Sequence, residues 1–203
     1  MSIDWADPGD AAAVADRLAA ILGRAGEKRI AVPGGSTPRR VFDLLAARKL
    51  DWAGTEVWLT DDRQVQHDHP ASNFGQLQAA LAGSDATLVE LREGASAPRF
   101  DLVWLGMGAD GHIASLFPIM AAEETSGPHI IATVPEPLPP EAPFARLSLN
   151  LEALTNADDI IVMVTGYEKR AVLEAALRGE DEHLPIAQLL RTATCPITIY
   201  WSP

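Results

Sequence analysis

The chain has 203 residues, of which 47% are hydrophobic and 22% charged, a composition that favours a folded globular protein. No apolar run approaches the roughly 18 residues that a membrane helix needs, which excludes a membrane protein. Its 16 Lys and Arg against 28 Asp and Glu give a formal charge of −12, which disfavours binding to nucleic acid and requires a local basic pocket for any anionic ligand. The single cysteine, Cys195, cannot form an internal disulfide, and the first residues lack the regions of a signal peptide, so we expect a cytoplasmic protein.

Helical and strand-like patterns alternate along the chain. Apolar residues recur at helical spacing in three segments: Asp10–Leu22, Val41–Leu45 and Glu168–Leu177. Short apolar runs typical of buried strands occupy Arg29–Val32, Glu56–Leu59, Phe100–Leu105, His129–Val134, Asp159–Val164 and Ile197–Trp201. This alternation predicts one α/β domain over residues 1–203, with an open, mostly parallel, doubly wound sheet and helices on both faces. The proline-rich residues 135–140 are expected to form a stiff loop within it.

A glycine-rich turn, Gly34-Gly35-Ser36-Thr37-Pro38, follows the first of these strands. Thr37 before Pro38 predicts a helix start with Thr37 as the N-cap residue and Pro38 at the first helical position. The glycines ahead of it expose backbone N–H groups, which at a helix start bind anions such as phosphate. An ordinary capped turn has the same sequence, so this motif alone leaves both interpretations open.

Basic residues at two predicted helix starts favour the phosphate interpretation. Arg39 and Arg40 follow the glycine turn, and Lys169 and Arg170 begin the helix after Gly166. The helix dipole opposes a positive charge at these positions unless an anion compensates it. Because only 16 residues of the chain are basic, four of them at these two places indicate a bound phosphate, although long side chains can also turn to solvent.

The segment Gly106-Met107-Gly108-Ala109-Asp110-Gly111-His112 has the G-x-G-x-x-G spacing of a dinucleotide site. We reject that interpretation, because Asp110 would place a carboxylate against the pyrophosphate and Pro118 limits the following helix to about two turns. Asp110 and His112, two residues apart after a strand, instead fit an oriented general base. A purely structural histidine remains the alternative.

Two other polar clusters lie between the glycine turn and Phe100. Asp61-Asp62-Arg63 follows a predicted strand and is either part of a site or a solvated loop. His67 and His69 resemble half of the H-x-H-x-D-H motif of metal-dependent lactonases, but Ala71 and Ser72 stand at its last two positions, so we expect no metal site. No motif for a covalent nucleophile is present, and Cys195 is expected in the core.

Taken together, these motifs resemble the 6-phosphogluconolactonase family within the larger group of sugar-phosphate isomerases and deaminases. The resemblance covers nearly the whole chain, and its segments are Gly34–Pro38, Asp61–Arg63 with His69–Asn73, Gly106–Pro118, Arg146–Leu149 and Thr165–Lys169. Gly106–Pro118 is the most specific of them. Two features depart from the family pattern. Asp62 stands where the family more often has Glu, and the stretch from Asn73 to Phe100 is short and lacks the helix that usually precedes the strand before Gly106.

The resemblance implies hydrolysis of 6-phospho-D-glucono-1,5-lactone without a cofactor or metal. His112 would be the general base, Asp110 would orient it, and Arg63 or backbone N–H groups would stabilise the oxyanion. The implied binding residues are Gly34, Gly35, Ser36, Thr37, Arg39, Asp61, Asp62, Asn73, Gly111, Arg146 and Lys169. The implied partner is a small phosphorylated sugar lactone, with no nucleic acid or membrane, and the protein is expected to be a monomer or weak homo-oligomer.

Two alternatives belong to other classes. Glucosamine-6-phosphate deaminases have Asn-Gly-His followed by Phe-Asn-Glu-Pro, where this chain has Asp110-Gly111-His112 and then Ser115-Leu116-Phe117-Pro118. A non-catalytic sugar-phosphate sensor would keep the phosphate loop and lose Asp110 or His112. Both residues are present, which argues against a sensor.

Overall fold

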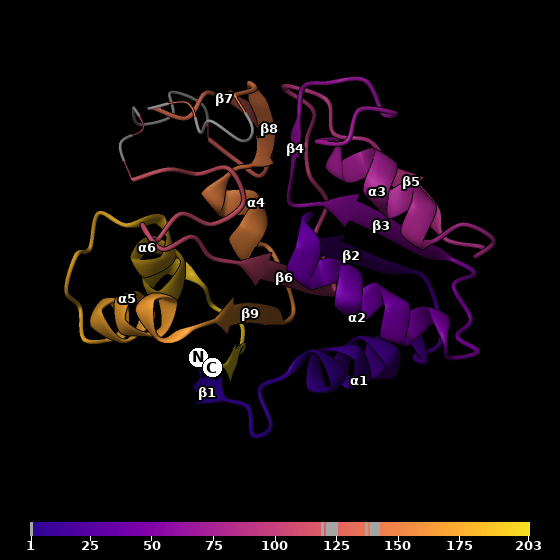
Figure 1. Ribbon diagram of the computed structural model, residues 1–203, viewed down its shortest axis with the longest axis horizontal. Helices are drawn as coiled ribbons and strands as arrows, with labels where there is room; N and C mark the ends of the chain where they lie inside the picture. The colour runs from indigo at the N-terminus through magenta and orange to yellow at the C-terminus, as the bar shows by residue number, and fades with distance from the viewer. Residues whose placement is uncertain (1, 119, 121–125, 137, 139–142) are drawn as a thin grey trace.

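A seven-stranded parallel sheet forms the centre of the protein in the computed structural model, which describes residues 2–118, 120, 126–136, 138 and 143–203 (Figure 1). Its spatial order is β1-β10-β9-β6-β2-β3-β5, and all neighbours are parallel. The strands are β1 (Ile3–Trp5), β2 (Lys28–Val32), β3 (Thr55–Leu59), β5 (Thr87–Val89), β6 (Leu102–Gly106), β9 (Ile160–Thr165) and β10 (Ile197–Ser202). The sheet is open, with β1 and β5 at its edges, which confirms the predicted fold class.

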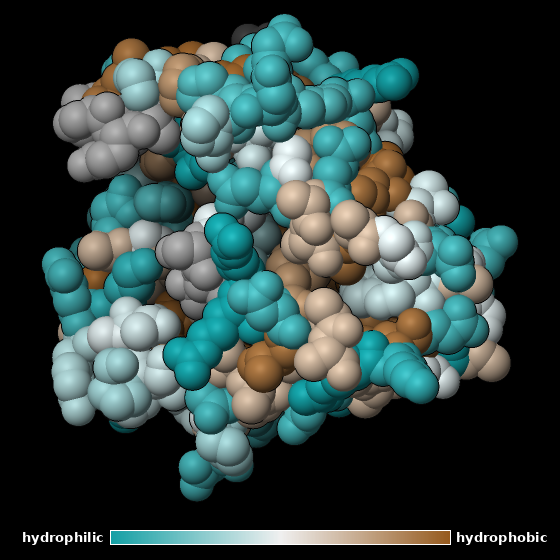
Figure 2. Space-filling model, turned by 45° about the vertical axis from the view of Figure 1, so that its right-hand side comes forward, coloured by the Kyte–Doolittle hydropathy of each residue, from teal (hydrophilic) through white to brown (hydrophobic). Residues whose placement is uncertain are grey.

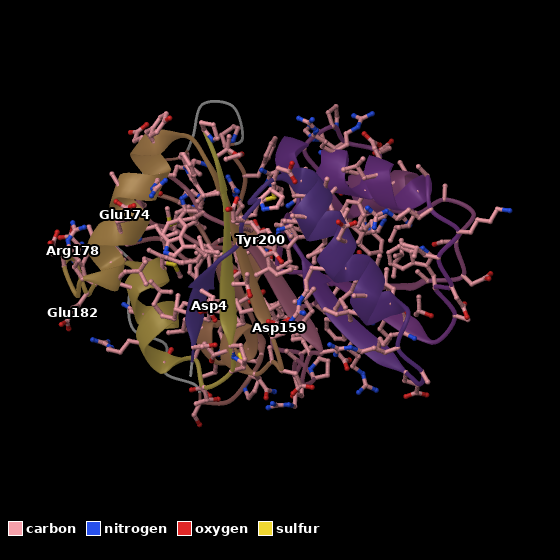
Figure 3. The ribbon with its side chains drawn as sticks, turned by 90° about the horizontal axis from the view of Figure 1, so that it is seen from below. Asp4, Asp159, Glu174, Arg178, Glu182 and Tyr200 are labelled. Atoms are coloured by element: carbon pink, nitrogen blue, oxygen red, sulfur yellow. The ribbon has the colours of Figure 1, made fainter. Side chains whose placement is uncertain are left out.

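Helices cover both faces of this sheet. They are α1 (Ala11–Leu22), α2 (Ser36–Ala46), α3 (Asn73–Ala80), α4 (Leu151–Thr155), α5 (Tyr167–Leu177) and α6 (Pro185–Thr192). α1 and α2 pack on one side of the strands and α5 and α6 on the other, as Figures 1 and 3 show. Because both faces are covered, the central strand β6 is buried from Leu102 to Leu105, with Trp104 inaccessible to solvent.

The face of the molecule drawn in Figure 2 carries both hydrophobic and hydrophilic residues. On the face in Figure 2, hydrophobic residues lie in small areas separated by hydrophilic ones. Among the residues that the structure describes, no helix has the length and apolar character needed to cross a membrane.

A second, antiparallel sheet corrects the predicted strand at His129–Val134. This segment forms β7 (Ile130–Thr133), which pairs with β8 (Arg146–Leu149) and not with the parallel sheet. β8 in turn pairs with β4 (Asp61–Arg63), in the order β4-β8-β7. β4 and β8 were not predicted as strands, because they are only three and four residues long and β4 consists of charged residues alone.

Two local predictions were wrong. Helix α2 begins at Ser36 with Gly35 as its N-cap residue, two residues earlier than a Thr37 cap requires. Gly35 has φ +99°, a conformation that glycine adopts without strain, and this allows the early start. After β6, the residues up to Pro118 form turns and isolated bridges of Ile113 to Met107 and Leu116, so the expected two-turn helix is absent from this described stretch.

The remaining expectations concern loops. The stretch from Asn73 to Phe100 contains helix α3, and the structure describes no helix between β5 and β6. In the proline-rich segment, Pro135, Glu136 and Leu138 lie outside helices and strands, whereas residues 137, 139 and 140 are outside the described residues.

Candidate active site

A cleft of about 270 Å³ opens at the carboxyl ends of β2, β6 and β9, beside the β4–β8 pair. The chain leaves β2 toward β3 on one side and leaves β6 toward β9 on the other, so the cleft lies where the winding direction of the sheet reverses. Open α/β sheets bind their ligands at this point. The cleft is lined by Pro33, Gly34, Pro38, Asp61, Arg63, Asn73, Trp104, Gly106, Met107, Gly108, His112, Ala114, Arg146, Met163, Thr165 and Lys169.

His112 and Asp110 form a hydrogen-bonded pair at the rim of this cleft. The distance from His112 Nδ1 to Asp110 Oδ1 is 2.6 Å, and the backbone N–H of His112 donates to the same oxygen at 3.3 Å. The side chains are 35% and 52% exposed, respectively, so water has access to both. Phe117 packs against the imidazole, with its ring centroid 5.1 Å from that of His112. The pair therefore has the geometry of an oriented base.

The turn that carries this pair depends on two glycines. A Cβ at Gly108 would lie 2.2 Å from the His112 ring and 2.5 Å from Asp110 Oδ1. Gly111 has φ +80° and packs against Leu184, and its carbonyl accepts a hydrogen bond from the Ile186 N–H at 3.1 Å. The start of α6 thus anchors the turn, and Gly111 acts through the backbone and does not line the cleft.

Arg63 and Arg146 stand opposite each other in the β4–β8 pair, and both line the cleft. Burial is the main effect that lowers the pKa of the Arg146 guanidinium, and the nearby charge of Arg63 lowers it further. The negative charge of Asp61 raises this pKa in part. Asp61 is itself buried and accepts a hydrogen bond from the Ser115 hydroxyl at 2.7 Å. Two cations facing one carboxylate make this wall locally positive in an acidic chain, as an anionic ligand requires.

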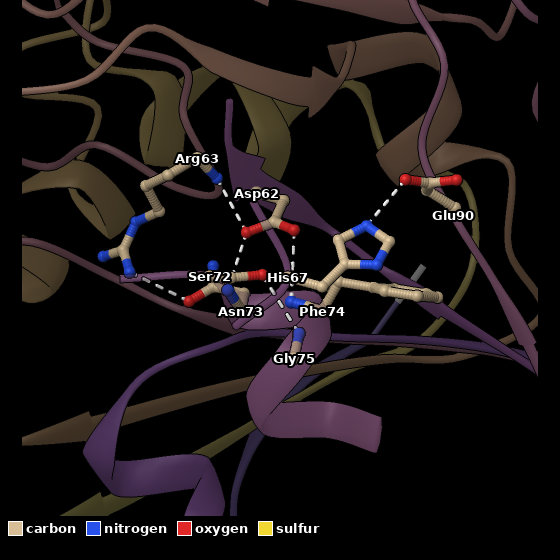
Figure 4. A network of polar contacts seen from close by, with 8 residues as sticks. All are labelled: Asp62, Arg63, His67, Ser72, Asn73, Phe74, Gly75 and Glu90. Carbon is tan, nitrogen blue, oxygen red and sulfur yellow. Dashed lines mark hydrogen bonds and ion pairs between the residues drawn. The ribbon is translucent and has the colours of Figure 1, made fainter. Parts of the chain in front are cut away.

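Asp62 does not line the cleft and instead holds the start of α3 (Figure 4). Its carboxylate accepts hydrogen bonds from the backbone N–H groups of Arg63 and Asn73, both at 2.7 Å, and from that of Phe74 at 3.1 Å. Burial raises the pKa of Asp62, and these three bonds oppose the increase. Asp62, which stands where the family more often has Glu, thus stabilises the start of α3 and does not face the cleft.

Asn73 connects Arg63 to the glycine turn. Its Oδ1 accepts a hydrogen bond from Arg63 Nη1 at 3.0 Å, and its Nδ2 donates to the Asp61 carbonyl at 3.0 Å. Arg63 Nη1 also donates to the Ala71 carbonyl at 2.9 Å, whereas Arg63 Nε is buried with no partner among the described residues. A Cβ at Gly34 would overlap the Asn73 amide, so glycine permits this close approach.

Of the four basic residues at helix starts, only Lys169 lines the cleft, and no carboxylate of the described residues pairs with it. Arg39 and Arg40 are exposed. Arg39 and Gly35 line a second cavity between α2 and α3, which adjoins the cleft and shares Gly34 and Asn73 with it. Arg170 forms an ion pair with Glu174 at 2.7 Å. The side chains of Ser36 and Thr37 are outside the part that the structure describes.

The cleft thus brings together seven of the residues predicted from sequence: Gly34, Asp61, Arg63, Asn73, His112, Arg146 and Lys169. Sequence reasoning missed the buried apolar side chains against which the cleft lies, those of Trp104, Met107 and Met163. Their position in or directly after the buried strands could have indicated them. His67 bonds to Glu90 at 2.7 Å, and within the described residues no group of three or more His, Cys, Asp or Glu could hold a metal ion.

Comparison with known proteins identifies the family. A sequence model described as glucosamine-6-phosphate isomerases/6-phosphogluconolactonase matches residues 9–87 and 84–201. The chain belongs to this family. A 6-phosphogluconolactonase of Pseudomonas putida is 35% identical over 212 residues, covering 94% of this chain and 86% of that protein. One of Rhizobium meliloti is 32% identical over 217 residues, covering 94% and 91%.

Solved structures agree in fold. A 6-phosphogluconolactonase from Shewanella baltica has a TM-score of 0.79 at 27% identity, covering 100% of this chain and 98% of that one. A monomeric glucosamine-6-phosphate deaminase has a TM-score of 0.77 at 15% identity, covering 99% and 97%. Because both activities occur on this fold, the fold alone does not separate a lactonase from a deaminase.

Proposed function

We propose that this protein hydrolyses 6-phospho-D-glucono-1,5-lactone to 6-phospho-D-gluconate in the oxidative pentose phosphate pathway. The observation that carries the proposal is the His112–Asp110 pair at one cleft that also contains Arg63, Arg146 and Lys169. Relatives named 6-phosphogluconolactonase, 32–35% identical over nearly the whole chain, support the same substrate. The proposed setting is the cytoplasm, with a monomeric or weakly self-associating enzyme.

His112 activates water in this mechanism. Its Nδ1–H donates to Asp110, which leaves the Nε2 lone pair to accept a proton. Water attacks C1 of the lactone as Nε2 takes that proton, and the carbonyl oxygen becomes an oxyanion. The C1–O5 bond then breaks, and the imidazolium returns the proton to O5, so the products are the open-chain hydroxyl and the carboxylic acid, which ionises in water.

The charged residues divide between the two ends of the substrate. Lys169 and Arg146, with the backbone at Gly34, bind the phosphate, because charge-assisted hydrogen bonds to two cations suit a dianion. Arg63, which lines the cleft and whose Nη1 is held by Asn73 and the Ala71 carbonyl, meets the oxyanion with its guanidinium. One such donor contributes about 10²- to 10³-fold to turnover. Asp110 stabilises the imidazolium that forms during the attack.

The deciding experiment measures two substrates side by side. Freshly generated 6-phosphogluconolactone is followed in a coupled assay, with spontaneous hydrolysis subtracted, and glucosamine 6-phosphate is tested in parallel. His112→Ala purified in the same way controls for lactonase carried over from the expression host. Turnover of the lactone alone supports the proposal. Turnover of only the amino sugar, or binding of 6-phosphogluconate without turnover of either compound, overturns it in favour of a deaminase or a sensor.

A further inference from the structure

Arg170 has a role that the phosphate interpretation of the helix starts did not foresee. Its guanidinium lies over the Trp201 ring, 4.3 Å from Cζ to the centroid, and 5.3 Å from the centroid of Trp5. Nε also donates to Glu174 at 2.7 Å, one turn along α5. With one carboxylate and two aromatic faces as partners, Arg170 is part of the surface packing of α5 and not a phosphate ligand.

Trp201 makes a second contact with the start of α5. Its indole Nε1–H donates to the Gly166 carbonyl at 3.1 Å. The N–H of Gly166 donates to the Ser202 carbonyl at 2.9 Å, so both polar groups of this one peptide residue bond to the end of β10. Gly166 is the N-cap residue of α5 and has φ +92°, a backbone conformation that glycine adopts without steric strain.

In the sequence, Gly166 lies between two residues that line the cleft. Thr165 precedes Gly166, Lys169 follows three residues later, and both side chains line the cleft. The orientation of the first turn of α5 therefore decides where the Lys169 ammonium lies. Trp201 restrains that turn twice, through the hydrogen bond to Gly166 and through the ring that covers Arg170, the neighbour of Lys169.

We infer that Trp201 is a positioning residue that directs Lys169 toward the phosphate of the substrate and so sets the preference for phosphorylated over unphosphorylated lactones. The inference rests on the proposed function. Trp201 itself contacts Gly166, Arg170 and Tyr167 and does not line the cleft, so its effect passes through the first turn of α5. Losing it should weaken phosphate binding and leave the chemistry at His112 unchanged.

The test is Trp201→Phe, which keeps an aromatic ring against Arg170 and removes the indole N–H. Trp5→Phe is the matched control, because Trp5 faces the same guanidinium without bonding to Gly166. For Trp201→Phe we expect KM for the phosphorylated lactone to rise about 3- to 10-fold, as for one hydrogen bond, with kcat within about twofold. The inhibition constant of inorganic phosphate should rise by the same factor. KM for unphosphorylated gluconolactone, and all constants of Trp5→Phe, should stay as in the wild type.

Equal increases of KM on both lactones, or unchanged constants with a lower melting temperature, would show that Trp201 is only structural. If Trp201→Phe does not fold, Arg170→Gln replaces it, since this change removes the stacked cation and should again affect only phosphorylated ligands. Calorimetric titration of wild type and variant with 6-phosphogluconate separates this inference from the proposed function. Wild-type protein that binds this compound without lactone turnover defeats the function alone, and equal affinity of wild type and variant defeats the inference alone.

Discussion

Replacing Gly108 by alanine tests the His112–Asp110 pair without changing either member. The new Cβ would lie 2.2 Å from His112 Nδ1 and 2.5 Å from Asp110 Oδ1, closer than such atoms approach one another. These groups are the ends of side chains that are 35% and 52% exposed, so they can swing toward solvent while the backbone keeps its place. The substitution should therefore separate the pair and leave the fold intact.

The two expected magnitudes differ widely. Because the displaced groups are accessible to water, the free energy of unfolding should change by less than about 1 kcal/mol. Loss of an oriented general base should lower kcat by about 10²- to 10⁴-fold. Gly106→Ala is the control for stability, since Gly106 belongs to the same strand end and a Cβ there meets nothing within 4 Å.

The assay combines lactone turnover with thermal unfolding, and includes the double variant Gly108→Ala with His112→Ala. If Gly108→Ala acts through His112, the double variant should be no slower than His112→Ala alone, because an interaction can be lost only once. Wild-type turnover in folded Gly108→Ala would refute the role of the pair. Multiplied losses in the double variant would place the effect of Gly108 elsewhere in the cleft.

Three further predictions concern single residues. His112→Ala should lower kcat at least about 10²-fold while 6-phosphogluconate still binds in calorimetry, and near wild-type turnover would exclude His112 from the mechanism. Lys169→Ala should raise KM for the phosphorylated lactone about 10- to 150-fold, without loss of thermal stability in phosphate-free buffer, because Lys169 has no carboxylate partner among the described residues. An equal loss on unphosphorylated gluconolactone would contradict a phosphate contact. Burial raises the pKa of the Cys195 thiol, so the native state holds less thiolate at pH 8 than the unfolded chain does. Its labelling by a disulfide reagent should be at least about tenfold slower in native protein than in urea, and equal rates would contradict its burial.

Much of the site was readable from local sequence because its parts are local. The Asp110–His112 pair spans two residues around Gly111, so a single turn suffices to join them. The glycine turn at Gly34 directly follows an apolar strand, and the carboxyl ends of parallel strands meet at one edge of a sheet. These features depend on neighbours in the chain, and the structure has them where the patterns predicted.

Other residues take their roles from distant partners. Arg63 and Arg146 face each other only because β4 and β8 pair in one register, and both segments are too short for their residue patterns to predict this pairing. Asp62 was expected to bind substrate, but the fold places its carboxylate on backbone N–H groups at the start of α3. The partners in these pairings are not neighbours in the chain, so a local pattern contains no information about them.

The sequence by itself determined the α/β class, the places of the main strands along the chain and the positions of the two glycine turns, since hydrophobic periodicity and backbone freedom are local properties. The tertiary structure alone decided which of the similar basic residues face the cleft. Arg170 is held by Trp201 from the last strand, and Arg39 turns to solvent beside α3, while Lys169 lines the cleft. The direction of a long charged side chain follows from the packing around it, and that packing exists only in the folded chain.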